Sequence, residues 1–400
     1  MSNGYIKSLD GVRAIAIILV MTFHADITHF GWVGVQLFFV LSGFLITSIL
    51  WKEKFKEDSL AFKFKKFWVR RSLRIFPLYF GYLFLLGITY LLFHFPWYYK
   101  TYFPYLVTYT FNYSRTLTQW HGNPLFTHLW SLSVEEQFYL FFPWIIFLCS
   151  SKVIKTLMIV FICISPVIRF LLGEYLKNKG YAPAVAADII YWNTGSHLDA
   201  FFMGGIIPVL GLDKKIDKPQ YLLYTGIVIT LLAGFWNFLN SDARPYFFID
   251  LGFNIGQINN YEHVWHYTIL NFLFASFILT LISIKSEHTF PKLRRLLESR
   301  WMVRIGKVSY GMYIYHWIIL VYVYQHLLHF TTPLLHLLSF IPYLISVYLI
   351  AELSYTLYES YFIKLKDKLF VRKAAAQDNF TSAVIPVKKE TVTLIKESPE

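Results

Sequence analysis

Two side chains with possible catalytic roles bracket an apolar stretch near the start of the chain, RAIAIILVMTFHAD, which begins at Arg13. Arg13 and His24 are eleven residues apart, so on one helix they lie about 20° apart in rotation and about 16 Å apart along the axis. His24 suits a general base, because a neutral imidazole accepts a proton near pH 7. A packing role for His24, with Arg13 as a snorkelling anchor, explains the same spacing.

A second group of candidate residues lies in RRSLRIFPLY, which holds Arg70, Arg71 and Arg74. Spacings of three and four residues place these side chains on neighbouring faces of a helix. Guanidinium groups donate paired hydrogen bonds to phosphate, so the cluster predicts a phosphate-binding site at a membrane entry. Anchoring to anionic lipid is the alternative. Pro77 is expected to limit this helix, just as the next apolar run begins.

A third group lies in HLWSLSVEEQFYLFFPW, where Ser133 and Glu136 match the S-x-x-E capping box of a helix start. A carboxylate there can also relay a proton with the nearby His128. Further along, SYGMYIYHW places Tyr313 and His316 at membrane depth. Buried histidine and tyrosine side chains commonly just hydrogen-bond their neighbours, so both interpretations stay open.

Other polar residues carry less information. The segment SHLDAFFMGG places His197 and Asp199 at the entry to an apolar run. The 13 histidines are scattered without the spacing of metal ligands, and the two cysteines lie in apolar segments. We therefore predict no metal site. The sequence also lacks a glycine-rich phosphate loop and a G-x-S-x-G elbow.

The elements that position these residues are expected to be membrane-spanning helices. The chain is 56% hydrophobic with a mean hydropathy of +0.46, and its apolar runs of about twenty residues are long enough to cross a bilayer. We predict an all-α, polytopic membrane protein with about ten transmembrane helices, at 10–29, 32–51, 75–95, 126–149, 153–172, 195–211, 221–239, 264–284, 308–329 and 335–357. The membrane domain occupies 1–360, and 361–400 is a polar cytosolic tail expected to be disordered.

The charge distribution sets the expected orientation. Of the 37 lysine and arginine residues, 31 fall on one side of the predicted membrane, and the other six are Lys100, Arg115, Arg169, Lys177, Lys179 and Arg244. By the positive-inside rule both termini are cytosolic, so the net charge of +13 reflects topology and not nucleic-acid binding. The basic and aromatic segment 51–77 suits an amphipathic helix on the inner leaflet, in contact with membrane lipids. The first apolar run lacks a cleavage site and is expected to be retained.

Five motifs, taken in order, resemble those of acyltransferase family 3, membrane proteins that move acyl groups from cytosolic acyl-CoA to extracytoplasmic glycans. They are LDGVRAIAIILVMTFH, GVQLFFVLSGFLIT, RRSLRIFPLY, HLWSLSVEEQFYL and YGMYIYHW. The resemblance implies that His24 is the catalytic histidine, with Arg13 as its companion. It also implies that Arg71 and Arg74 serve the donor, and that Glu136 matters beyond capping.

The resemblance further implies acetyl-CoA or another acyl-CoA as donor, and a surface polysaccharide such as lipopolysaccharide O-antigen as acceptor, in the cytoplasmic (inner) membrane of a bacterium. His24 would deprotonate the acceptor hydroxyl or carry a transient acyl group. Two departures stand out: His197 replaces an arginine usual in the family, and Glu359 is followed by SYF where the family often has E-x-P. The sequence shows no fused hydrolase-like segment, so we expect this chain to complete transfer alone or with a separate partner.

Two other classes of protein fit parts of the pattern. A transporter or exporter of a glycan or small organic acid would use His24 and Glu136 as a proton relay. A non-catalytic scaffold for polysaccharide assembly would leave the coexistence of Arg13, the arginine cluster and His24 without a reason. The acyl group, the acceptor hydroxyl and the oligomeric state are left open by the sequence.

Overall fold

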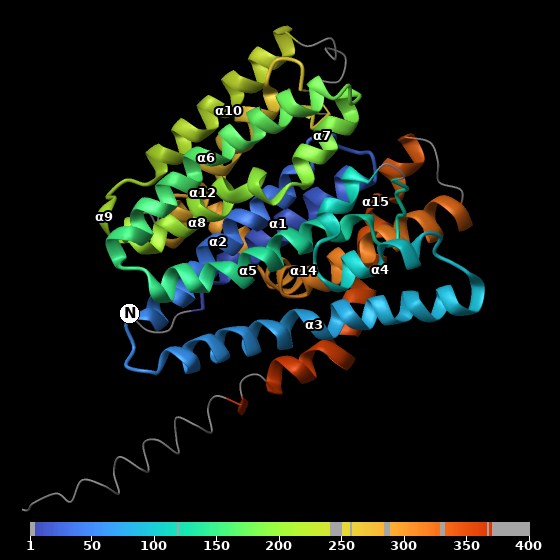
Figure 1. Ribbon diagram of the computed structural model, residues 1–400, viewed down its shortest axis with the longest axis horizontal. Helices are drawn as coiled ribbons and strands as arrows, with labels where there is room; N and C mark the ends of the chain where they lie inside the picture. Colours follow the sequence, from blue (N-terminus) through green and yellow to red (C-terminus); the bar gives the residue numbers. More distant parts are fainter. Residues whose placement is uncertain are drawn as a thin grey trace, which may run out of the picture.

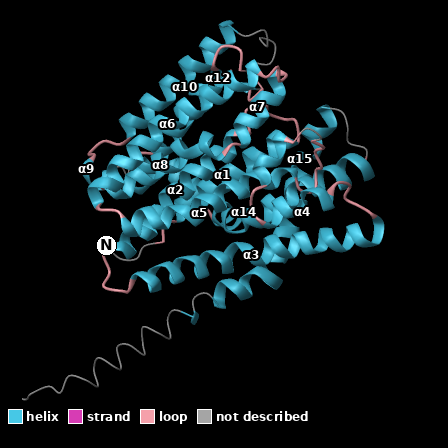
Figure 2. Ribbon diagram, viewed as in Figure 1, coloured by secondary structure: helices cyan, strands magenta, loops and turns pink. Residues whose placement is uncertain are grey.

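All regular structure in the described part of the chain is helical (Figures 1 and 2). The computed structural model describes residues 5–117, 120–240, 250–256, 258–283, 289–328, 333–365 and 368–369. Most of the predicted tail at 361–400 lies outside these residues. The all-α fold class predicted from the apolar runs is confirmed.

The described helices vary widely in length. They are α1 (Lys7–His24), α2 (Val33–Lys54), α3 (Leu60–Phe93), α4 (Tyr99–Val107), η1 (Phe111–Thr116), η2 (Thr127–Leu129), α5 (Trp130–Leu148), α6 (Ser151–Asn178), α7 (Pro183–Trp192), η3 (Thr194–His197), α8 (Leu198–Leu210), α9 (Leu212–Lys215), α10 (Gln220–Asn240), α12 (Glu262–Ile282), α13 (Pro291–Leu297), α14 (Arg300–Ile318), η6 (Ile319–Leu327), α15 (Pro333–Ser354) and η7 (Tyr355–Glu359).

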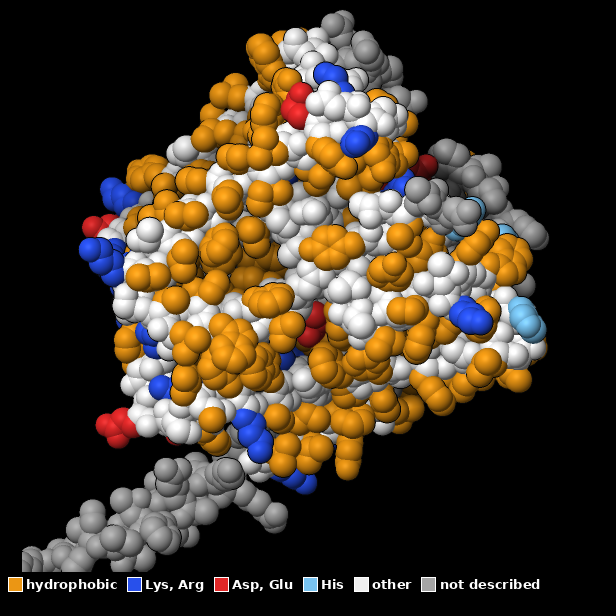
Figure 3. Space-filling view, in the orientation of Figure 1, with side chains coloured by type: hydrophobic (Ala, Val, Ile, Leu, Met, Phe, Trp, Pro, Cys, Tyr) orange, Lys and Arg blue, Asp and Glu red, His pale blue; other side chains and the backbone are white. Residues whose placement is uncertain are grey.

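Six helical stretches in the described residues are long and apolar enough to cross a membrane: α2, α3, α6, α10, α12 and Leu337–Leu365. The chain is therefore an integral membrane protein, but the predicted count of about ten spans is not confirmed. The other four predicted ranges coincide with α1, η2 and α5, η3 and α8, and α14 with η6. Large apolar side chains remain exposed on the long helices, among them Leu231 and Leu232 of α10. Apolar side chains also cover much of the face shown in Figure 3, as a lipid-facing surface requires.

The basic segment and the third predicted span form one continuous helix, α3, which Figure 1 shows running along one side of the bundle. The expectation that Pro77 limits this helix is wrong. Two hydroxyls from other helices donate to carbonyls beside the proline: Tyr310 Oη to Ile75 O at 3.1 Å and Tyr358 Oη to Pro77 O at 3.1 Å. α3 continues through Pro77 to Phe93, and these two hydrogen bonds tie it at this point to α14 and η7.

Close backbone contacts fix the central helices α1, α2, α8 and α14. A Cβ on Gly306 of α14 would lie 1.9 Å from the Asp10 carbonyl oxygen of α1, and a Cβ on Gly204 of α8 would lie 1.9 Å from the Val40 carbonyl oxygen of α2. Small residues allow helices in a membrane to approach in this way. The contact at Gly306 brings Tyr310 and Tyr313, on the following turns of α14, toward the first helix.

Candidate active site

A small cavity of about 100 Å³, which we call the internal cavity, lies among α1, α2, α3, α5 and α14. Its lining includes Arg13, Arg71 and Arg74 from the two basic motifs. It also includes Ser131 and Tyr313, from the third motif and the late Tyr–His segment. Residues from all five sequence motifs therefore line one cavity. The second motif, in α2, contributes Phe38, Phe39 and Ser42.

Arg13 is held in place by a carboxylate on its own helix. Its guanidinium donates to Asp10, one turn earlier, and the Tyr5 hydroxyl donates to the same carboxylate. Asp10 is 3% exposed, so this ion pair is largely shielded from water. An arginine fixed in this way presents its remaining N–H groups in a defined direction, as a ligand site requires.

The arginine cluster of α3 divides between two cavities. Arg71 and Arg74 line the internal cavity with Arg13, and the Arg71 guanidinium carbon lies 4.9 Å from the centroid of the Tyr139 ring. Arg70 lines a neighbouring cavity of about 180 Å³, which Arg71 and Arg74 also border. The predicted convergence of guanidinium groups is therefore present, with Arg71 and Arg74 at its centre.

The glutamate motif is placed differently from the sequence expectation. Glu135 lines the internal cavity, where it accepts hydrogen bonds from the hydroxyls of Ser42 and Tyr139. Glu136 is absent from that lining, and its buried Oε1 has no hydrogen-bond partner among the described residues. The capping-box interpretation is wrong, because Ser133 lies inside α5 and its hydroxyl donates to the Leu129 carbonyl at 3.4 Å.

Glu135 is the functional candidate that the sequence analysis missed. Ser131, Glu135 and Tyr139 are spaced by four residues, so they share one face of α5 and all three line the cavity. This polar stripe along an otherwise apolar helix was the available signal. The role predicted for Glu136 stays a prediction.

A cluster of three histidines adjoins the end of the cavity at which Tyr313 lies. The His24 ring stacks on Trp317 with centroids 4.2 Å apart and lies 5.1 Å from the His316 ring. The His316 and His128 rings are 5.2 Å apart. His24, His128 and His316, separated by up to 292 positions in the chain, are thus neighbours in the fold.

One ring nitrogen of His316 is left available for chemistry. His316 Nδ1 lies 2.7 Å from the Tyr313 carbonyl oxygen, which can only accept, so Nδ1 carries the proton. The other nitrogen, Nε2, then bears a lone pair and has no hydrogen-bond partner in the described residues. A basic nitrogen of this kind, beside His24, can accept a proton or hold one in transit.

Tyr313 connects the cavity with the histidine cluster. Its ring lines the cavity, and its centroid lies 5.4 Å from that of His316 and 5.6 Å from that of His128. Its hydroxyl lies 2.5 Å from the Ser131 hydroxyl and 2.8 Å from the His128 carbonyl oxygen. His24 is not part of the cavity lining, so Tyr313 stands between the arginine-lined space and the predicted base.

The polar residues at the start of α8 belong to a structural network. Asp199 accepts hydrogen bonds from Arg169 at 3.0 Å, from Thr268 at 2.6 Å and from Asn271 at 3.0 Å. His197 lies within 3.0 Å of the Gln36 amide and 2.5 Å of the Tyr191 carbonyl oxygen. Because these buried groups are paired with one another, they join α6, α8 and α12 and leave little capacity for a ligand.

The fold and the site together define a class of protein: a helical membrane protein with an arginine-lined cavity next to a histidine cluster. The family model described as an acyltransferase domain matches residues 6–355. The chain belongs to this family, acyltransferase family 3, whose motifs its sequence resembles.

Individual relatives agree with the family match. The chain is 29% identical over 386 residues to "Putative O-acetyltransferase SACOL0978" of Staphylococcus aureus strain COL, covering 90% of this chain and 58% of the relative. It is 27% identical over 421 residues to O-acetyltransferase OatA of Staphylococcus aureus strain MRSA252, covering 96% and 62%. The chain thus spans about three fifths of the length of these relatives. The search of solved structures finds no match.

Proposed function

We propose that the chain transfers an acyl group, acetyl in the first instance, from cytosolic acyl-CoA to a hydroxyl of an extracytoplasmic or lipid-linked polysaccharide. One observation carries the proposal. A single cavity runs from Arg13, Arg71 and Arg74 to the pair formed by Ser131 and Tyr313, and the histidine cluster packs against Tyr313 on the other side. The transporter alternative draws no support from the family match.

The shape and charge of the cavity suit the two halves of acyl-CoA. The guanidinium groups would hold phosphates at one end, since each can donate in a bidentate fork. The whole cavity measures only about 100 Å³, so it suits the thin, phosphate-free pantetheine arm and not the bulkier nucleotide. The thioester would then lie at the Ser131 and Tyr313 end, next to the histidines.

The reaction requires a base that removes the proton of the acceptor hydroxyl. His24 would take the proton of the acceptor hydroxyl while the oxygen attacks the thioester carbonyl. The C–S bond then breaks, and the departing CoA thiolate receives the proton that His24 had accepted, which returns His24 to its neutral form. His316, with a lone pair on Nε2 beside His24, would stabilise the charge that develops there. Donor and acceptor would meet at this point from opposite sides of the membrane.

The acceptor side of the proposal rests on the family and on relatives named as O-acetyltransferases, OatA among them. A bacterial surface polysaccharide, with lipopolysaccharide O-antigen as one example, supplies suitable hydroxyls. Aromatic rings lie at the end of the molecule opposite the start of α1. One example is the stacked pair Tyr98 and His121, whose centroids are 4.2 Å apart, and such rings offer flat surfaces for sugars. The proposal places the protein in the cytoplasmic membrane with both termini cytosolic.

The test uses purified protein in proteoliposomes that enclose a glycan acceptor, with radiolabelled acetyl-CoA outside. We expect label to appear on the enclosed glycan, and mass spectrometry of surface glycans to show loss of acetyl groups from cells without the gene. Transport of glycan without label transfer would favour the exporter instead. A chain that neither hydrolyses nor transfers from acetyl-CoA would refute the proposal.

A further inference from the structure

A second, wider cavity of about 570 Å³ opens beside the arginine cluster. It is bordered by the start of α1, the end of α2, the start of α14 and the η7 segment. Its lining shares Arg13, Leu45, Arg74 and Tyr310 with the internal cavity, so the two spaces meet at these four residues. We call this wider cavity the vestibule.

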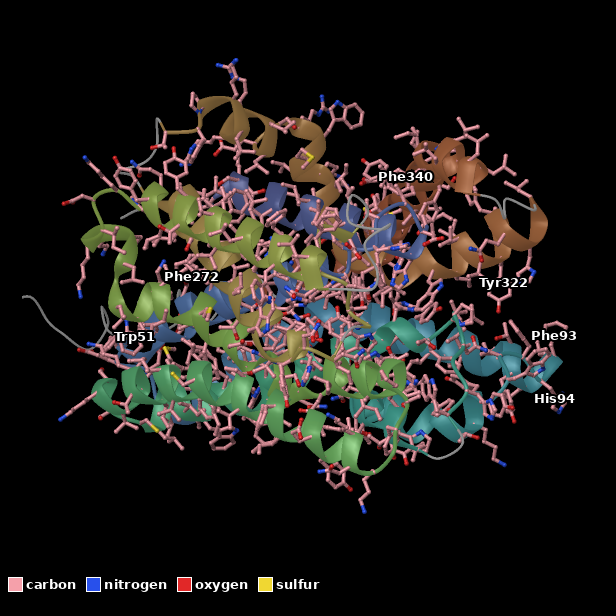
Figure 4. All side chains as sticks on the ribbon, turned by 90° about the horizontal axis from the view of Figure 1, so that it is seen from above. Trp51, Phe93, His94, Phe272, Tyr322 and Phe340 are labelled. Carbon is pink, nitrogen blue, oxygen red and sulfur yellow. The ribbon has the colours of Figure 1, made fainter. Side chains whose placement is uncertain are left out.

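The vestibule lies at the end of the molecule that holds the start of the chain (Figure 1). Lys52, in its lining, follows Trp51, and Figure 4 places Trp51 at the opposite end from Phe93 and His94. By the positive-inside rule this basic end is cytosolic, as the proposed function requires. A cytosolic ligand would therefore meet the vestibule before the internal cavity.

The charge of the vestibule is mainly positive. Five of its lining side chains are cationic and two are carboxylates; these seven are Arg13, Lys52, Arg74, Arg304, Lys307, Asp10 and Glu359. Arg13 is paired with Asp10, and Arg304 with Glu352. Lys52 and Lys307 are exposed, and in the described residues neither has a carboxylate within ion-pair distance. Two ammonium groups therefore remain for an anionic ligand.

Aromatic rings accompany these two lysines. Lys307 Nζ lies 5.3 Å from the centroid of the Tyr5 ring. Tyr355 also lines the vestibule, where its ring centroid is 5.1 Å from the Arg304 guanidinium carbon. Tyrosine and arginine planes of this kind are surfaces on which a purine base stacks.

The neighbouring cavity near Arg70 makes a poorer site for phosphates. It is smaller, at about 180 Å³, and its lysines are already engaged. Lys66 is paired with Glu53 at 3.0 Å, and Lys63 donates to the carbonyl oxygens of Lys54 and Lys56 at 3.0 and 2.6 Å. A ligand there would have to displace these contacts, whereas the vestibule lysines require no such exchange.

We propose that the vestibule binds the 3′-phosphorylated ADP half of acyl-CoA, with Tyr5 or Tyr355 stacking on its adenine. Lys52 and Lys307 would add to the phosphate contacts of Arg13 and Arg74, which line both cavities. The inference rests on the proposed function and adds a subsite to it. The vestibule's volume of about 570 Å³ falls within the range of about 300–1,000 Å³ that is usual for ligand pockets. The pantetheine arm would pass from it between Arg13 and Arg74 into the internal cavity.

The test compares two donors that share a thioester and differ in phosphates: acetyl-CoA and acetyl-pantetheine. In the full chain carrying Lys52→Ala and Lys307→Ala, we expect the apparent KM for acetyl-CoA to rise by roughly tenfold or more, because charge-assisted contacts are lost. The kinetic constants for acetyl-pantetheine should stay at wild-type values. Lys52→Arg with Lys307→Arg keeps both charges and should restore the KM for acetyl-CoA.

The matched control is Lys63→Ala with Lys66→Ala, which removes two lysines from the neighbouring cavity. This control should leave the apparent KM for both donors at the wild-type value. The assignment would be overturned if the vestibule variant raised the apparent KM equally for both donors. It would also be overturned if the control variant, and not the vestibule variant, raised the KM for acetyl-CoA.

A binding measurement separates this inference from the proposed function. Adenosine 3′,5′-bisphosphate should bind the solubilised wild-type chain and bind the vestibule variant roughly tenfold more weakly. If wild-type protein shows no acyl transfer yet gives this difference, the proposed function fails and the nucleotide site stands. Absent binding to wild type, or equal binding to both proteins, would refute the nucleotide site.

Discussion

Replacing His24 by phenylalanine separates the two interpretations of this residue that the sequence leaves open. A phenylalanine ring keeps a stacking partner for Trp317, which lies 4.2 Å from the His24 centroid, but has no nitrogen to accept a proton. An aromatic contact of this kind contributes about 0.5–1.5 kcal/mol. General-base catalysis contributes about 10²–10⁴-fold in rate, or about 2.7–5.4 kcal/mol of activation free energy. The catalytic effect is therefore the larger of the two.

If His24 is the base, the acyl-transfer rate per folded enzyme should fall by about 10²–10⁴-fold in His24→Phe and in His24→Ala alike. The melting temperature of the phenylalanine variant should stay close to that of wild type. Binding of a non-hydrolysable CoA analogue should also survive, because His24 is absent from the lining of the internal cavity. The assay is single-turnover transfer, normalised to protein that remains monodisperse in detergent.

A matched control is His326→Phe, since the His326 ring also lies beside an aromatic partner, Tyr322, with centroids 5.7 Å apart, outside the histidine cluster. This control should transfer at the wild-type rate. A His24→Phe variant with wild-type turnover, beside a destabilised His24→Ala variant, would show that His24 only packs and would refute the catalytic assignment.

Three further predictions follow from the rest of the structure. Arg71→Lys with Arg74→Lys keeps the charge but loses the planar forks, so affinity for a CoA analogue should fall by roughly tenfold while membrane insertion persists; unchanged affinity would make both residues lipid anchors. A cysteine at position 58, in a chain whose two native cysteines are replaced, should resist a membrane-impermeant reagent in intact cells, and ready labelling would contradict the proposed orientation. Asp199→Ala leaves Arg169 buried without its carboxylate, so it should cost about 3–5 kcal/mol of folding free energy and lower the melting temperature. An unchanged melting temperature would refute the structural role of this network.

The positions of the helices were largely predictable from the sequence. In a bilayer every backbone polar group must be satisfied within the segment, so an apolar run of about twenty residues has few alternatives to a helix. The break expected at Pro77 was wrong: α3 continues through the proline, where it contacts Tyr310 and Tyr358 of helices more than 230 positions away in the chain. Local sequence around a proline cannot reveal such partners.

The candidate site was predictable in its residue types and less so in its geometry. Arg71 and Arg74 meet Arg13 at one cavity, a convergence that no local spacing predicts. The pairing of Asp199 with Arg169 depends on contacts among α6, α8 and α12 that no local spacing encodes. The vestibule likewise combines residues from both ends of the chain.

The glutamate motif shows why adjacent residues of the same type need the fold to tell them apart. Successive helical residues differ by about 100° in direction, so Glu135 and Glu136 cannot face the same space. The orientation of α5 is set by its neighbours: Ser42 of α2 and Tyr139 hold the Glu135 carboxylate, and Ser131, one turn earlier, meets Tyr313 of α14. Glu135 therefore borders the internal cavity, whereas Glu136 is absent from its lining and its buried Oε1 has no hydrogen-bond partner among the described residues. Glu135 is therefore the glutamate placed to act directly on a ligand in this cavity, and the role predicted for Glu136 stays a prediction.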